Sequence, residues 1–335
     1  MVESDRDMVP CMVVPLSRVE DVRKKLCEDN KLDMSHRIEV RGQYAYLPVS
    51  GSLEASFPVE EFSCRRIPHR PSSYKEHLCL PEDVVDLLPS SYDIVGELVV
   101  IRLPEPLLQH SSAIGGALLK FVPGSRQVFL DRGTMGDWRI RNLVPLAGEG
   151  GTKTIHRENG VDIVVDLSKA YFSPRLAGEH WQVTCMVEEG ERILDMFTGT
   201  GGFPLTIAKN RKPGKVIAVD INPGAIELLE ESIRLNRLDR IETHVMDAMN
   251  IDSSIGADRV IMNLPHGANI FLRHALECTR PGGMIHYHHI LDVIEQEEIE
   301  RNLVDKYPVR IVDKRTVRTY APGQIHMVFD LKKDI

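Results

Sequence analysis

The chain has 335 residues and a formal charge of −8, with 42% hydrophobic and 27% charged residues. This length predicts two or three domains, and this composition is typical of globular proteins with substantial cores. No apolar run approaches the roughly 20 residues of a membrane-spanning helix, and the acidic N-terminus is unlike a signal peptide. The six cysteines include no Cys-x-x-Cys pair, so we expect no disulfides, no metal site and a cytoplasmic protein.

Residues 1–57 are expected to form a small α+β domain. Ser17 and Glu20 make a capping-box pattern ahead of an amphipathic helix. Strands are expected at residues 11–15, 37–40 and 44–49. Three prolines interrupt residues 58–73, which we interpret as a linker.

A middle α+β domain is expected over residues 74–168. Its first apolar run, IVGELVVIRL, predicts two strand segments that bend at Gly96. A helix is expected near residues 111–119, and further strands near 127–130 and 161–165.

Residues 169–335 show the alternation of strands and helices that is typical of a doubly wound parallel sheet. Five short apolar strands are predicted at residues 192–197, 215–220, 241–245, 258–264 and 283–290. Two more, 309–320 and 325–331, are joined by a turn at Gly323 that permits an antiparallel hairpin at the sheet edge. The sequence therefore predicts an α/β fold with a seven-stranded Rossmann-like sheet.

A glycine-rich turn, DMFTGTGGF, follows the first of these strands and opens a helix. Gly199 and Gly201 let the backbone approach a ligand, and Asp220 at the end of the next strand could bind ribose hydroxyls. These features alone fit dinucleotides as well as S-adenosylmethionine. Pro204 in place of a third glycine, Asp247 after the third strand and the closing hairpin favour S-adenosylmethionine and a class I methyltransferase fold. The alternative is that both aspartates are ordinary helix N-caps.

The motif Asn263-Leu-Pro-His266 follows the fourth strand, at the edge of the sheet where ligands bind. The amide of Asn263 could hydrogen-bond to the edge of a planar base, as in methyltransferases that act on ring nitrogens. A simple turn after a buried strand is the alternative.

The whole chain resembles the archaeal and eukaryotic type of tRNA (guanine-N1)-methyltransferase that acts on position 37. The resemblance runs through DWRIRNLVPLAGE, TIHRENG, KAYFSPRLAGE, DMFTGTGGF, AVDINPGAIELL, RVIMNLPHGA, GGMIHYHH and KRTVRTYAP. It implies that the small N-terminal domain binds the body of the tRNA and that the middle domain also binds RNA. It further implies transfer of a methyl group from S-adenosylmethionine to guanosine 37 of tRNA, by a monomeric enzyme.

The resemblance assigns three catalytic residues. Guanine N1 carries a proton, so a base is required, and Glu179 matches that position of the family. Arg139 matches the residue that stabilises charge on O6, and Asn263 the one that orients the guanine. Without the resemblance, Glu179 could be a surface carboxylate, and Arg139 could form a solvated basic pair with Arg141.

The residues expected to bind the cofactor are Tyr171, Arg175, His180, Asp195, Phe197, Gly199, Gly201, Asp220, Ile221, Asp247, Ala248, Asn263 and Pro265. His180 stands where relatives often have arginine, which leaves its contact with the cofactor open. His286, His288 and His289 are interpreted as strand packing and not as metal ligands.

The negative net charge disfavours RNA binding unless basic residues cluster locally. Such a cluster lies between residues 301 and 320, which include six basic residues and only two acidic ones. Lys314, Arg318 and Tyr320 are predicted to grip and stack on the anticodon loop. A solvated charged strand pair is the alternative.

Other functions fit parts of this pattern. A related enzyme transfers the aminocarboxypropyl group of the same cofactor during wybutosine synthesis, and a dual-activity enzyme would also methylate a tricyclic intermediate. A non-catalytic RNA-binding module and an NAD-linked oxidoreductase are the more distant alternatives.

Overall fold

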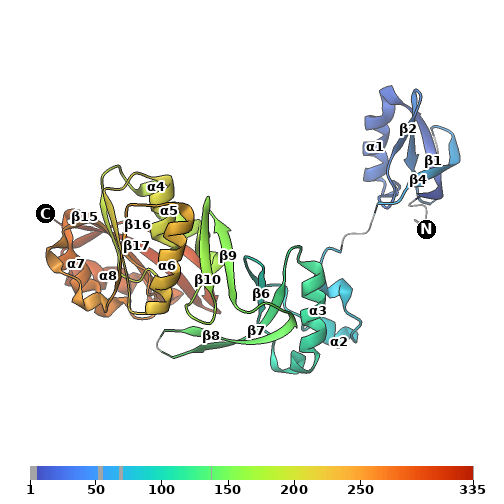
Figure 1. Cartoon of the computed structure of the whole chain (residues 1–335). Coiled ribbons are helices and arrows are strands. Elements are labelled where there is room, and N and C mark those ends of the chain that lie inside the picture. Colours follow the sequence, from blue (N-terminus) through green and yellow to red (C-terminus); the bar gives the residue numbers. More distant parts are fainter. Residues whose placement is uncertain (1–5, 52–55, 68–70, 137, 335) are drawn as a thin grey trace. The chain divides into compact units, whose positions relative to one another are not determined.

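The computed structural model describes residues 6–51, 56–67, 71–136 and 138–334. They form two compact units, residues 1–72 and residues 73–335 (Figure 1). Within the described ranges, no helix is long and apolar enough to cross a membrane. Asp137, the first residue of the DWRIRN motif, lies outside the described residues.

The N-terminal unit is a four-stranded antiparallel sheet with the strand order β2-β3-β1-β4 and one packed helix. Its elements are β1 (Arg6–Pro15), a 3-10 turn (Leu16–Arg18), α1 (Val19–Glu28), β2 (Glu39–Arg41), β3 (Tyr44–Pro48) and β4 (Val59–Arg65). Leu26 of α1 packs against Val14 and Leu47 of the sheet, which makes a small separate core.

Two expectations for this unit are wrong. Arg18 holds the N-cap position of α1 and makes no side-chain cap, because Ser17 lies within the preceding 3-10 turn. The expected linker is a strand over Val59–Arg65, since this segment extends the sheet by pairing with β1. Pro68, in the same expected linker, lies outside the described residues.

The second unit begins with a four-stranded sheet in the order β5-β6-β7-β8. The strands are β5 (Asp93–Val95), β6 (Leu98–Ile101), β7 (Gln127–Met135) and β8 (Ile140–Gly148). The helical elements are η2 (Tyr74–His77), α2 (Glu82–Val85), η3 (Glu105–His110) and α3 (Ser111–Phe121). Ile114 and Leu118 of α3 pack on Val99 and Val128. Gly96 has φ +54°, and a Cβ there would lie 2.3 Å from the Ile155 carbonyl oxygen, so the bend requires glycine.

A two-stranded hairpin, β9 (Lys153–Glu158) and β10 (Val161–Asp166), connects this sheet to the C-terminal part. Ile163 and Val165 of β10 pack against Leu205 and Leu229 from helices of the larger sheet. Of these strands, β10 was predicted from the sequence, whereas β8 and β9 were not.

The C-terminal part is a seven-stranded sheet with the order β13-β12-β11-β14-β15-β17-β16. Its strands are β11 (Arg192–Asp195), β12 (Lys215–Asp220), β13 (Ile241–Val245), β14 (Ala257–Met262), β15 (Thr279–Asp292), β16 (Val309–Ala321) and β17 (Gln324–Lys333). Strands β11 to β15 are parallel, and β17 runs antiparallel to both of its neighbours. This confirms the predicted doubly wound sheet and its edge hairpin.

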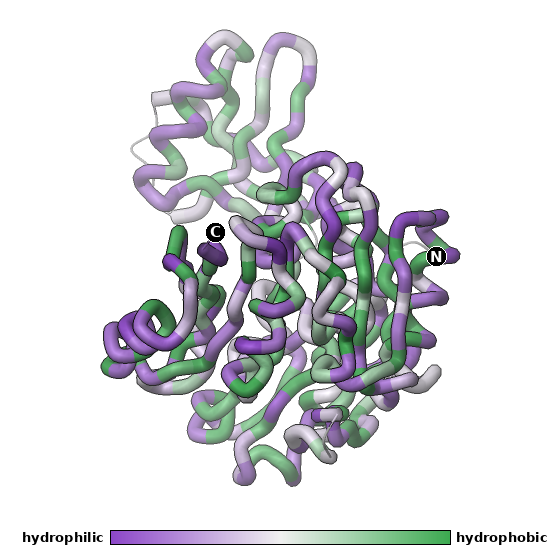
Figure 2. Tube along the Cα trace, turned by 90° about the vertical axis from the view of Figure 1, so that its left-hand side faces the viewer, coloured by the Kyte–Doolittle hydropathy of each residue, from purple (hydrophilic) through white to green (hydrophobic). Residues whose placement is uncertain are grey.

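Helices cover both faces of this sheet. The helices are α4 (Ala177–Met186), α5 (Gly202–Asn210), α6 (Pro223–Asn236), α7 (Leu272–Cys278) and α8 (Gln296–Lys306). Short 3-10 turns are η4 (Pro174–Leu176), η5 (Ala248–Asn250), η6 (Ser253–Ile255), η7 (Ala268–Ile270) and η8 (Val293–Glu295). On β12, Val216 packs with α4 and α5, while Ile217 packs with α7 on the other face. Hydrophobic and hydrophilic stretches alternate along the chain in Figure 2, as expected for elements with one buried side.

Candidate active site

A cavity of about 920 Å³ opens at the carboxyl edge of the large sheet. Residues of the middle domain, among them Asp93, Asp131, Arg139 and Arg141, form its other wall. This volume is in the range of pockets that enclose small molecules. The predicted residues that line it are Arg139, Tyr171, Arg175, His180, Phe197, Gly199, Asp220, Ile221, Asp247, Ala248, Asn263, Pro265, Arg318 and Tyr320. Four others, Glu179, Asp195, Gly201 and Lys314, are not among the lining residues.

The glycine turn is held by the carboxylate of Asp220. The Gly199 backbone N–H donates to one oxygen of Asp220 at 2.7 Å, and the Asn222 N–H donates to the other at 2.9 Å. Burial raises the pKa of Asp220, and these backbone hydrogen bonds act in the opposite direction. Asn222, and not Asp220, caps α6 by accepting from Gly224. The helix-cap alternative is therefore wrong for Asp220.

Asp247 follows β13 and does act as a cap. Its Oδ1 accepts a hydrogen bond from the Met249 backbone N–H at 2.9 Å, at the start of η5. The same residue lines the cavity beside Ala248. Capping and ligand binding are compatible here, because a carboxylate has further lone pairs.

Asp195 and Gly201 belong to the glycine turn but do not line the cavity. Asp195 is fully buried at the end of β11, and its Oδ2 finds no hydrogen-bond partner among the described residues. Burial raises the pKa of Asp195 to about 7. Gly201 has φ +95°, and a Cβ there would lie 2.3 Å from Leu229. These two residues shape the turn and are not part of the cavity wall.

His180 has a buried carboxylate as its partner. Its Nδ1 lies 2.6 Å from Glu158, and its ring covers Gly202, where a Cβ would come within 2.2 Å of the imidazole. Burial would raise the pKa of Glu158, but His156 and His180 hold it at about 2. His180 thus packs against the glycine turn while one side faces the cavity.

Arg139 and Arg141 differ in burial and in their partners, so they do not form a solvated basic pair. Arg141 is only 7% exposed and donates to Asp93 at 2.9 Å and to the Phe172 carbonyl at 3.0 Å. Arg139 is partly exposed, and its guanidinium lies 5.9 Å from the ring centre of Tyr171. Within the part of the chain that the structure describes, no carboxylate forms an ion pair with Arg139. Its charge is available to a ligand.

Arg175 bridges the two walls of the cavity. Its Nε donates to Asp93 at 2.8 Å, and Asp93 also binds Arg141. Tyr171 lines the same cavity, with its ring centre 5.7 Å from the Arg141 guanidinium. This segment therefore fixes the middle sheet against the large sheet.

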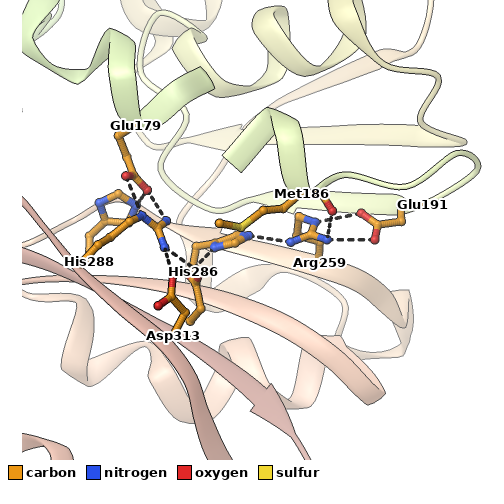
Figure 3. A network of polar contacts seen from close by, with 9 residues as sticks. Glu179, Met186, Glu191, Arg259, His286, His288 and Asp313 are labelled. Carbon is orange, nitrogen blue, oxygen red and sulfur yellow. Dashed lines mark hydrogen bonds and ion pairs between the residues drawn. The ribbon is translucent and has the colours of Figure 1, made fainter. Parts of the chain in front are cut away.

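Glu179 is buried at the start of α4, so the surface-carboxylate alternative is wrong. It is 5% exposed, and Arg315 of β16 donates to its two oxygens at 2.9 and 2.5 Å (Figure 3). His288 Nε2 lies 4.0 Å from the same carboxylate. Arg315 could not be predicted as a partner of Glu179, because it lies 136 residues away in the chain.

The Asn263 loop meets the edge hairpin across the cavity. The Ile290 N–H donates to the Pro265 carbonyl at 3.1 Å, which fixes the loop behind β14. His266 Nε2 and the Tyr320 hydroxyl lie 3.0 Å apart. Burial, followed by the charge of Arg139, lowers the pKa of His266. Asn263 is thereby held on the same cavity as Arg139.

The two basic residues of the hairpin that were predicted to bind RNA, Arg318 and Lys314, lie in different surroundings. Arg318 lines the cavity beside Tyr320, with its guanidinium 5.8 Å from that ring centre. Its buried Nε has no hydrogen-bond partner among the described residues. Lys314 instead forms an ion pair with Glu300 of α8 at 2.6 Å, away from the cavity. Of the two basic residues predicted to bind RNA, only Arg318 faces the site.

The chain is similar to known proteins over nearly its full length. Three family models match: the tRNA methyltransferase 5 N-terminal domain over residues 11–57, the TYW2 N-terminal domain over 74–152, and the TRM5/TYW2 methyltransferase domain over 154–317. The tRNA (guanine(37)-N(1))-methyltransferase Trm5b of Pyrococcus abyssi is 38% identical, over 97% of this chain and 99% of its own. The chain belongs to the Trm5 family of tRNA (guanine(37)-N(1))-methyltransferases.

Solved structures of Trm5 proteins share the fold over the full length. A crystal structure of wild-type Trm5b from Pyrococcus abyssi has a TM-score of 0.83 at 37% identity, covering 98% of this chain and 100% of that chain. A complex of aTrm5 and tRNALeu has a TM-score of 0.80 at 33% identity, covering 97% and 99%.

A relative with the other reaction matches less of the chain. The tRNA(Phe) (4-demethylwyosine(37)-C(7)) aminocarboxypropyltransferase of Pyrococcus horikoshii is 30% identical over 76% of this chain and 92% of its own. A structure of P. horikoshii TYW2 in complex with MeSAdo has a TM-score of 0.64 at 29% identity, covering 76% and 94%. The Trm5 N-terminal domain and the full-length matches place the chain on the methyltransferase side of the family.

Proposed function

We propose that this Trm5 protein transfers the methyl group of S-adenosylmethionine to N1 of guanosine 37 in tRNA, with Glu179 as the general base. Arg139 stabilises the charge on O6, and Asn263 orients the guanine. The observation that carries this proposal is the shared cavity, which brings Arg139 and Asn263 from different sheets next to the glycine turn. The full-length similarity to Trm5b supports the choice of substrate.

The cavity residues fit S-adenosylmethionine. Asp220 projects from the end of β12, where it would accept hydrogen bonds from ribose hydroxyls. Asp247 would accept from the adenine amino group, with Phe197 and the exposed Ile221 against the ring faces. Gly199 has no neighbour nearer than 4.0 Å at its Cβ position, so the turn leaves room for a ligand. When bound, this cofactor supplies a methyl group on a sulfonium.

The acceptor needs groups that this chain provides. N1 of guanine has to lose a proton before it can attack a methyl carbon, and negative charge then moves toward O6. A fixed arginine near O6 stabilises that charge in a site with little water. Arg315 holds Glu179 beside the cavity, and Glu179 would reach N1 while one of its oxygens stays paired with Arg315.

A base in a structured loop has to be turned out of its stack to enter such a cavity. The exposed indole of Trp138 and the ring of Tyr320 line the cavity and offer surfaces for stacking. Arg318, beside Tyr320, would contact the RNA backbone.

Arg318 should contribute more to tRNA binding than Lys314. We expect Arg318→Ala to weaken tRNA binding several-fold at physiological salt. It should also make the slope of log binding constant against log salt concentration shallower by about one. Lys314→Ala should change both quantities less, because Lys314 is paired with Glu300. Filter binding at several salt concentrations measures both. No effect of either variant would remove the hairpin from the RNA interface, and equal weakening by both would contradict the larger role of Arg318.

The small product distinguishes the proposed reaction from the aminocarboxypropyl alternative. Incubation with S-adenosylmethionine and a tRNA transcript carrying guanosine 37 should release S-adenosylhomocysteine. Release of methylthioadenosine would contradict methyl transfer. A transcript carrying the tricyclic wybutosine intermediate, tested in parallel, shows whether the enzyme has a dual activity. A cytoplasmic location and a monomeric state stay predictions.

A further inference from the structure

Glu179 is one end of a buried polar network that crosses the interior between α4 and the sheet (Figure 3). Arg315 binds Glu179 and also donates to Asp330 of β17 at 2.6 Å. His286 of β15 lies 2.6 Å from Asp330 and 2.8 Å from Arg259 of β14. Arg259 in turn donates to Glu191 at 2.8 and 3.0 Å, and to the Met186 carbonyl at the end of α4 at 2.7 Å.

The contacts fix the protonation state of His286. An arginine can only donate, so Nε2 of His286 has to accept from Arg259. Its Nδ1 then carries the single proton and donates to Asp330. Burial lowers the pKa of His286, which agrees with a neutral ring. His286 therefore adds no charge to the network.

One negative charge in this network has no cation of its own. Arg259 is paired with Glu191, whereas Arg315 is shared by two buried carboxylates, Glu179 and Asp330. Asp313 also lies 3.9 Å from Arg315, but it is 56% exposed and is screened by solvent. Uptake of one proton would make the buried network neutral, and Arg315 would keep a carboxylate partner.

We propose that Arg315 and Asp330 are positioning residues that make Glu179 the one member of this network that takes up a proton. The proposal rests on the proposed function, in which Glu179 removes the proton from guanine N1. In that step the N1–H proton would move to a Glu179 oxygen and the electron pair would stay on N1. N1 would then bond to the methyl carbon as the carbon–sulfur bond breaks, and the electron pair of that bond would go to sulfur. Arg315 aims the Glu179 carboxylate toward the site, and Asp330 shares the charge of this arginine.

The other members of the network are poor proton acceptors. Burial would raise the pKa of Asp330, but His286 and Arg315 hold it below its ordinary value. Burial lowers the pKa of His288, which faces Glu179 from β15, well below its ordinary value, and lowers that of His326 on β17 to about 4. His288 Nδ1 and His326 Nε2 lie 3.1 Å apart, so both neutral rings are held in place. On α4 itself, His180 is paired with Glu158.

The test is the pH dependence of single-turnover methyl transfer, with saturating S-adenosylmethionine and guanosine-37 transcript. A base that has to be ionised produces a limb on the acidic side of this profile. Arg315→Gln removes the cation and should move the limb to higher pH by about one unit or more. Asp330→Asn removes the competing anion and should move it to lower pH, since the asparagine oxygen still accepts from His286.

Arg259→Gln is the matched control. The Arg259 side chain is 7% exposed, against 11% for Arg315, and it belongs to the same network. It has no recorded hydrogen bond or ion pair with Glu179 or Asp330. It should lower the melting temperature as Arg315→Gln does, yet leave the limb in place. Arg315→Lys keeps the charge without the two-pronged geometry, so it should keep the limb and lower the plateau rate.

Opposite shifts for Arg315→Gln and Asp330→Asn, with none for Arg259→Gln, would support the proposal. Unshifted limbs, or shifts in the same direction, would overturn it. Glu179→Gln separates this result from the proposed function. If that variant retains the full rate, the assignment of the base is wrong; if it is inactive and the limbs do not move, only the positioning role is wrong.

Discussion

Replacing Glu179 by glutamine should lower the single-turnover rate of methyl transfer by about 10²- to 10⁴-fold at neutral pH. Glutamine has nearly the same shape and can still accept a hydrogen bond from Arg315, but its amide cannot take the proton from N1. The variant should bind S-adenosylmethionine as the wild type does, because Glu179 does not line the cavity in this structure. Rapid-quench kinetics and calorimetry measure the two quantities.

Glu191→Gln is the control for this variant. Glu191 is a largely buried carboxylate that also binds an arginine, at the other end of the same network. We expect it to reduce stability and to leave the rate within a few-fold of wild type. Equal losses for the two variants would mean that the rate follows the integrity of the fold, and Glu179 would lose its assignment.

Replacing Arg139 by alanine should lower the rate of methyl transfer by about 10²- to 10³-fold. The reason is that its guanidinium faces the cavity without a carboxylate partner among the described residues, so its charge can act on O6. The loss should appear mainly in kcat, because the charge on O6 develops in the transition state. Arg139→Lys should recover part of the rate, since it keeps the charge but not the planar fork.

Arg132→Ala is the control for charge alone. Arg132 is an exposed arginine on β7 and is not among the cavity-lining residues. It should change tRNA affinity slightly and kcat little. An Arg139→Ala enzyme with unchanged kcat and a raised KM would show that Arg139 binds RNA without taking part in the chemistry.

Much of the C-terminal fold could be predicted from the sequence. Its five parallel strands are short apolar runs between helices, and the glycine turn, Asp220 and Asp247 follow strands that the βαβ rule places side by side. Strands that lack such an apolar run could not be predicted from the sequence. The strand β8 is half-exposed along most of its length, and β4 is a polar edge strand, so neither has a clear apolar signature.

The partners of the site residues could not be predicted, because sheet register brings them together over long distances. Arg315 of β16, next to β17 at the end of the sheet order, contacts Glu179 across 136 residues of chain. Two histidines interpreted as strand packing proved to be polar partners: His286 binds Asp330, and His288 faces His326. His180 likewise has a role that no motif indicated, because Glu158 lies on the unpredicted strand β9.

We expect the methyl group to go to N1 of guanosine 37 with Glu179 as the base. The most direct measurement is methyl transfer from labelled S-adenosylmethionine to two transcripts that differ only in guanosine or adenosine at position 37, followed by digestion and identification of the nucleoside. We predict 1-methylguanosine from the guanosine transcript and no labelled product from the adenosine transcript, with the product lost in Glu179→Gln. Label in both transcripts, or at another position, would contradict this account.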